Sequence, residues 1–98
     1  MTAEQLAYFK RLLAEPGVSG YEGRAQAVWR ERVEDVADGY SEDAHGSAVA
    51  VVNPDADERV MLVGHIDEIG LLVKHVADNG FLHVASVGGM RRHLLQSQ

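Results

Sequence analysis

The sequence predicts an α/β fold in which helices cover part of a sheet. Apolar residues recur at helical spacing within residues 6–36, and short runs rich in Val, Ile, Leu and Phe replace that pattern from residue 48 onward. The dipeptide Asn79-Gly80, which is typical of tight hairpin turns, separates the last two of these runs. Helices followed by strands favour a layer of helices packed against a sheet.

The first helix is expected to begin after Thr2 and to end near Ala14. Thr2 and Gln5 form a capping-box pattern, in which each side chain accepts a hydrogen bond from a free backbone N–H of the first turn. Pro16-Gly17 then stops the helix. Its apolar residues lie at helical spacing: Leu6, Phe9 and Leu13.

A second helix is expected after a second capping-box pattern, Ser19 to Glu22. Gly39 is its expected stop, because glycine adopts the left-handed conformation that follows many helices without a Cβ penalty. The residues expected on the buried face are Ala25, Val28, Trp29 and Val36.

Four β-rich runs follow the helices. Residues 69–76 and 81–87 flank the Asn-Gly turn and are predicted to form a hairpin. Residues 48–52 form a shorter run. Val60–Val63 is apolar at every position, which is expected of a strand covered on both faces.

The length of the hairpin loop decides where two histidines point. A loop of two or four residues places His75 and His83 on opposite faces of the ribbon, whereas a three-residue loop brings them together. Because Asn-Gly favours a two-residue loop, we expect both histidines to be exposed on opposite faces.

Composition narrows the classes of function. The 98 residues carry a formal net charge of −6, and the basic clusters are short, so neither nucleic acid nor an anionic membrane is an expected partner. The chain has no cysteine, so any metal ion must be held by histidine and carboxylate. The first five residues lack the regions of a signal peptide, and no apolar run approaches the ~20 residues of a membrane span. We expect a soluble, cytoplasmic protein.

The candidate functional residues are His65, Asp67 and Glu68, which follow shortly after the apolar run Val60–Val63. Open α/β sheets place ligand sites at the carboxyl ends of buried strands. Neutral imidazole is the commonest metal ligand, and residues i and i+2 of extended backbone face the same side. Asp67 is therefore expected to bond the His65 ring nitrogen that a metal ion does not use.

Other interpretations of these polar residues stay open at this point. A single histidine at a strand end is often an ordinary surface or core residue, and Asp67-Glu68 is also compatible with a solvated turn. His45 is expected in a turn, and His93 lies in a tail without pattern. Ser19 has no base placed near it in the sequence, so a helix cap is its expected role rather than a nucleophile.

Four segments, taken in order, carry a resemblance to a known family. They are EPGVSGYEGRAQAVW (residues 15–29), SEDAHGSAVAVV (41–52), VMLVGHIDEIGLLVKHVADNGFL (60–82) and VGGM (87–90). Together they resemble the beginning of the glutamyl-aminopeptidase and tetrahedral (TET) aminopeptidase family, cytoplasmic dinuclear metallopeptidases that are sometimes labelled endoglucanases.

The resemblance implies roles for individual residues. His65 matches the family's first metal ligand, and Asp67 matches the active-site Asp that orients this histidine. Asp43 matches an acidic residue before a Gly-Asn turn, although Ser47 stands here in place of the Asn. The implied cofactor is a pair of divalent ions, zinc or cobalt, that activates a water for the hydrolysis of N-terminal residues from short peptides.

The resemblance also implies a division of the chain. Residues 1–68 match the N-terminal part of a zinc-peptidase-like α/β/α catalytic domain, with two helices followed by a mixed sheet. Residues 69–98 match the first hairpin of an inserted β-barrel domain used for homo-oligomeric assembly, of which a dodecamer is one form.

In family members the remaining metal ligands and the general-base Glu follow the inserted domain. The chain is therefore expected to be an N-terminal fragment that is inactive alone. The alternative is a complete, non-catalytic binding or assembly module that retains the family's sheet and hairpin.

Overall fold

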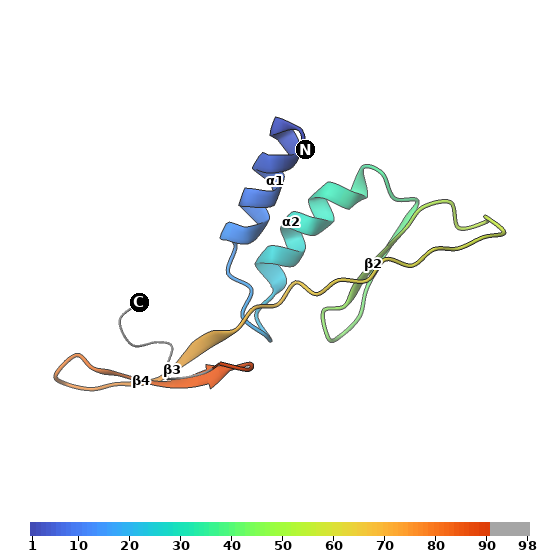
Figure 1. Cartoon of the computed structure of the whole chain (residues 1–98). Helices are drawn as coiled ribbons and strands as arrows, with labels where there is room; N and C mark the ends of the chain where they lie inside the picture. The colour runs from blue at the N-terminus through green and yellow to red at the C-terminus, as the bar shows by residue number, and fades with distance from the viewer. Residues whose placement is uncertain (91–98) are drawn as a thin grey trace.

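The computed structural model describes residues 1–90, and its helices and strands are arranged in three pairs (Figure 1). The two helices lie side by side, and each of the two sheets is an antiparallel ribbon of two strands. The elements in chain order are α1 (Ala3–Ala14), α2 (Gly23–Glu34), β1 (Gly39–Glu42), β2 (Ala48–Val51), β3 (Gly70–Val76) and β4 (Leu82–Val87).

Helix α1 has the predicted bounds and cap. The Gln5 N–H donates to the Thr2 hydroxyl oxygen at 3.2 Å, and the Thr2 N–H donates to Gln5 Oε1 at 2.8 Å. Both bonds satisfy donors that a helix start leaves free, so the capping box is confirmed.

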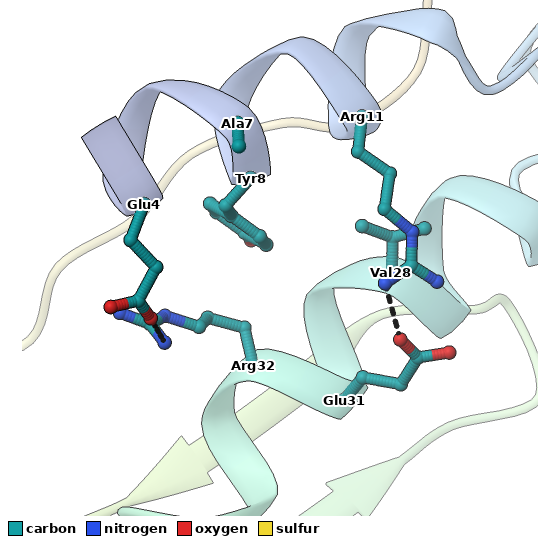
Figure 2. Close-up of a pocket in the computed structure, with 7 residues that line it drawn as sticks. All are labelled: Glu4, Ala7, Tyr8, Arg11, Val28, Glu31 and Arg32. Atoms are coloured by element: carbon teal, nitrogen blue, oxygen red, sulfur yellow. Dashed lines mark hydrogen bonds and ion pairs between the residues drawn. The ribbon is translucent and has the colours of Figure 1, made fainter.

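Ion pairs bridge α1 and α2 across a hollow of about 330 Å³ between them (Figure 2). Arg11 pairs with Glu31 at 2.6 Å, and Arg32 pairs with Glu4 at 2.9 Å. Tyr8 projects between the helices, and its partial burial raises the pKa of its phenol. These charges are largely exposed, so each ion pair adds little to stability.

Helix α2 starts and ends differently from the prediction. Its N-cap is Glu22, without a side-chain cap, so the predicted capping role of Ser19 is wrong. The helix ends at Glu34 because the chain then joins a sheet: the Asp38 N–H donates to the Val51 carbonyl at 2.8 Å. Gly39 is therefore the first residue of β1 and not a helix stop.

The core is small and belongs to α2. Within residues 1–90, the buried apolar side chains are those of Ala25 and Val28, each 3% exposed. Both were predicted to lie on the buried face. Trp29, also on that face, packs against Tyr40 of β1 with the ring centroids 6.0 Å apart, whereas Val36 follows the helix and is 67% exposed.

The first ribbon pairs β1 with β2, from Gly39 opposite Val51 to Glu42 opposite Ala48. The predicted run at residues 48–52 is thus confirmed as β2. Strand β1 was not predicted, because Gly-Tyr-Ser-Glu shows no apolar alternation. The Gln26 amide of α2 donates to the Gly46 carbonyl at 2.5 Å and ties the ribbon's turn to the helix.

The second ribbon confirms the predicted hairpin but corrects its loop. Ala77 and Phe81 close a three-residue loop, in which Gly80 has φ +85°. Three-residue loops place glycine at this left-handed position. With this loop His75 lies directly opposite His83, so the prediction that they point to opposite faces is wrong.

The predicted strand at Val60–Val63 is absent from the described structure. These residues belong to no strand, and each side chain is 80–92% exposed. A strand needs a neighbour to bond its N–H and C=O groups, and no described segment pairs with this one. In place of one mixed sheet, the described residues form two separate ribbons.

The molecule is more open than a compact domain of its length. Its radius of gyration is 18.0 Å, against about 13 Å for a compact chain of this size. Its accessible surface is 8435 Å², against roughly 5500 Å² for a folded monomer of this mass. Within residues 1–90, no helix has the length and apolar character needed to cross a membrane.

Candidate metal-binding site

Two segments far apart in the sequence meet at the predicted site. The connection between α1 and α2 lies beside the segment that leads into β3, and Val18 and Glu68 form a parallel bridge (Figure 1). The Glu68 N–H donates to the Gly17 carbonyl at 2.8 Å, and the Ser19 N–H donates to the Glu68 carbonyl at 3.2 Å. Backbone bonds thus hold the His65–Glu68 segment against the N-terminal part of the chain.

Two glycines allow this close approach. A Cβ on the buried Gly17 would lie 3.2 Å from the Ile66 carbonyl oxygen. A Cβ on Gly70 would overlap a methyl carbon of Val18. The absence of a side chain at both positions therefore brings the two segments into hydrogen-bonding range.

His65 and Asp67 make the contact expected from their spacing. His65 Nδ1 lies 3.0 Å from Asp67 Oδ1 and 3.1 Å from the Asp67 carbonyl oxygen. Both partners are acceptors, so Nδ1 carries the hydrogen and donates it. In neutral imidazole the other nitrogen, Nε2, then has a free lone pair. The side chain is 86% exposed, which leaves Nε2 accessible to a ligand.

Ser19 holds the other oxygen of the same carboxylate. Its hydroxyl donates to Asp67 Oδ2 at 2.6 Å. The hydrogen bond from Ser19 and then that from His65 lower the pKa of the Asp67 carboxyl, because both favour the ionised form. Ser19, Asp67 and His65 therefore form one chain of hydrogen bonds that ends at the free Nε2.

Glu68 acts on the backbone rather than on the histidine. The Gly17 N–H donates to Glu68 Oε1 at 3.2 Å, in addition to the backbone bonds between the two segments. Asp67 and Glu68 are thus not a solvated turn: one holds His65 and the other holds the loop that carries Ser19.

Asp43 lies at the turn between β1 and β2. Its Oδ1 accepts hydrogen bonds from the N–H groups of His45, at 2.8 Å, and Ser47, at 2.9 Å. These bonds, led by that from Ser47, lower the pKa of the Asp43 carboxyl. Asp43 therefore stabilises a turn that also contains His45, and Ser47 contributes to this turn through its backbone N–H.

The arrangement of His65 and Asp67 is suited to binding a metal ion through one ligand. Imidazole with a carboxylate on its second nitrogen is a common arrangement for histidines that bind zinc. Nowhere in residues 1–90 do three or more His, Asp or Glu side chains gather as a metal site would require. Within residues 1–90, His65 is thus a candidate for a single metal ligand, supported by Asp67, and the described residues hold no full coordination sphere.

Sequence reasoning missed the role of Ser19. The residue is 48 positions from Asp67, and nothing in its local pattern distinguishes it from a helix cap. The available signal was its place between glycines: Gly17 and Gly20 allow a tight loop that passes another segment closely.

Comparisons with known proteins find relatives of similar sequence and fold. The sequence profile of the M42 glutamyl aminopeptidase family matches residues 46–98. The lysyl aminopeptidase of Pyrococcus furiosus is 36% identical over 90 residues, which cover 91% of this chain and 26% of that protein.

Two solved structures are also similar. A TET aminopeptidase from the marine sediment archaeon Thaumarchaeota archaeon SCGC AB-539-E09 has a TM-score of 0.87 at 28% identity, over 96% of this chain and 26% of that one. An endoglucanase from Thermotoga maritima has a TM-score of 0.79 at 29% identity, over 90% of this chain and 29% of that one. The present chain thus spans about a quarter of its relatives' length. It belongs to the M42 glutamyl aminopeptidase family.

Proposed function

We propose that this chain is the N-terminal part of a metal-dependent aminopeptidase that removes N-terminal residues from short peptides. The observation that carries the proposal is the exposed Nε2 of His65, held in the metal-binding tautomer by Asp67. Family membership supplies the reaction class, since the relatives are aminopeptidases. The protein is proposed to act in the cytoplasm.

His65 would hold one ion of a two-metal centre, zinc or cobalt, and Asp67 would orient it. The other ligands would come from outside the described residues. When bound, such a pair supplies an activated water and polarises the scissile carbonyl. The task of this chain is positional: Ser19 fixes Asp67, Asp67 fixes His65, and the bonds between Gly17 and Glu68 hold the whole segment in place.

The exposed apolar surface supports a role within a larger protein. Val60–Val63 immediately precedes the His65–Glu68 segment in the chain, and 80–92% of each of its side chains is exposed. We propose that further polypeptide covers this run and pairs with it as a strand of the catalytic domain of residues 1–68. Residues 69–98 would begin an inserted β-barrel domain that mediates homo-oligomeric assembly.

Aminopeptidase assays on the complete gene product test this proposal. The protein should release the N-terminal residue of aminoacyl p-nitroanilides and short peptides, lose that activity to a chelator, and regain it with zinc or cobalt. The 98-residue chain alone should be inactive. A complete gene product that is inactive with every divalent ion supplied, or fully active in chelator, would contradict the proposal.

A further inference from the structure

We propose that His75 and His83 form a second site for a divalent transition-metal ion, on the β3–β4 hairpin and separate from His65. The two residues are directly opposite in the register, and their ring centroids are 5.5 Å apart with a tilt of 44° between the planes. Both residues are exposed, so an ion can reach them from solvent.

The ring separation fits a shared metal ion. Two imidazoles that bind one tetrahedral zinc, each through a nitrogen about 2.0–2.1 Å from the ion, have centroids roughly 5 Å apart. The observed separation of the ring centroids, 5.5 Å, is close to that value. Two imidazole nitrogens without a carboxylate favour borderline ions such as Zn²⁺, Ni²⁺ and Cu²⁺ over Mg²⁺ or Ca²⁺. Water would complete the coordination.

The hairpin fixes this arrangement before any ion binds. The three-residue loop, with Gly80 at φ +85°, sets the register that places the two histidines opposite each other. Each ring is carried by a strand that is hydrogen-bonded to the other strand. A second ligand held in this way acts at high effective concentration, so the pair should bind an ion much more tightly than one histidine does.

The hairpin site does not depend on the proposed peptidase centre. His65 precedes β3, and its ring nitrogen bonds Asp67, whereas His75 and His83 lie on the hairpin itself. In Figure 1 the hairpin extends away from the two helices. An ion on the hairpin would join β3 to β4 and stabilise the ribbon by an amount that grows with the logarithm of the free ion concentration once that concentration exceeds the Kd.

Zinc titration of the 98-residue chain, followed by NMR of the histidine Hε1 signals, tests the proposal. In the unmodified chain, the signals of His75 and His83 should shift together with one apparent Kd. His75→Gln and His83→Gln should each weaken that binding about tenfold or more. His45→Gln, a substitution of another exposed histidine, should leave it unchanged, as should His65→Gln.

The opposite results would overturn the site. They are separate Kd values for the two histidines in the unmodified chain, or an unchanged affinity in either Gln variant. Because the shared titration needs no substitution, a variant that failed to form the hairpin would not obscure the answer. A loss of the shared binding in His65→Gln would show that the ion belongs to the His65 site instead.

Discussion

Each oxygen of the Asp67 carboxylate accepts a hydrogen bond from one side chain: Oδ2 from Ser19 and Oδ1 from His65. Such support on the far side of a metal-binding imidazole fixes the tautomer and the ring orientation. The contact between His65 and Asp67 could be predicted, because residues two apart in extended backbone share a side. The contact with Ser19 could not, because it depends on how the two segments fold together.

Asp67→Asn should weaken metal binding at His65 while leaving the fold intact. The amide still offers one acceptor oxygen, but it lacks the charge that favours the Nδ1–H tautomer. We expect about a 10–100-fold loss of metal affinity or activity in the complete gene product, measured by metal titration and peptide hydrolysis. Unchanged affinity would show that Asp67 does not support the ligand.

Ser19→Ala should raise the pKa of the Asp67 carboxyl toward its ordinary value. The hydroxyl is the leading cause of the lowered pKa, and alanine removes it. NMR titration of the Asp67 carboxyl carbon measures the change. Ser41→Ala, on the exposed strand β1, is the matched control and should leave this pKa where it is. Equal pKa values in the two variants would contradict the assigned hydrogen bond.

At the scale of elements, glycines and turns determine how the strands pair and in which register. The hairpin of residues 69–87 was predictable from two β-rich runs around Asn-Gly. Its loop length was not, because a two-residue turn and a three-residue loop ending in Gly80 both suit this dipeptide. Strand β1 escaped prediction for a different reason: Tyr40 is its only apolar residue, and pairing with β2 overrides its weak local pattern.

Gly70→Ala should loosen the contact between the two segments of the site. The new Cβ would lie within 3.2 Å of three side-chain carbons of Val18, a β-branched residue that rotates poorly. We expect about 1–3 kcal/mol of local destabilisation. Faster amide hydrogen exchange at Ser19 and Glu68 would report it.

Two further variants test that steric explanation. Gly39→Ala, where a Cβ meets nothing within 4 Å, is the control and should leave these amides protected. Adding Val18→Ala to Gly70→Ala should restore part of the protection. Equal exchange rates in Gly70→Ala and Gly39→Ala would refute the close approach.

The turn between β1 and β2 should depend on pH through Asp43. The folded-state pKa of this carboxyl is lowered, so its stabilising effect is present above the unfolded pKa, about 3.9. The effect is lost as pH falls through the lower folded pKa. Cross-strand NOEs should therefore weaken in acid below about pH 4. Asp43→Asn keeps an acceptor without a titrating group, and its NOEs should stay constant over that window; the same acid loss in both proteins would contradict the assignment.

At the scale of the whole molecule, the uncovered surface is the main feature. The fold class was predictable from the two periodicities, but the pairing of Val60–Val63 was not. An apolar run indicates that a segment is stabilised by burial. Whether the segment is buried depends on the neighbouring segments that can cover it. The radius of gyration is 18.0 Å and two apolar side chains are buried among residues 1–90, so these described residues do not supply the neighbours that Val60–Val63 needs.

The exposed run should make the isolated chain self-associate. Leu62 is 92% exposed, and an unpaired extended apolar segment is a template for association. Leu62→Lys should shift the sedimentation of the chain toward monomer at the same concentration. Asp55→Asn changes the net charge by the same amount on an exposed residue and should have no such effect. Monomeric behaviour of the unmodified chain across the accessible concentrations would contradict the prediction.

The metal content of the complete gene product with and without the His65 imidazole tests the central claim most directly. The His65→Ala protein should lose one of its bound ions per chain and nearly all of its aminopeptidase activity, whereas His45→Ala should retain both. Full metal content and unchanged turnover in His65→Ala would contradict the claim that this histidine is a ligand of the catalytic centre.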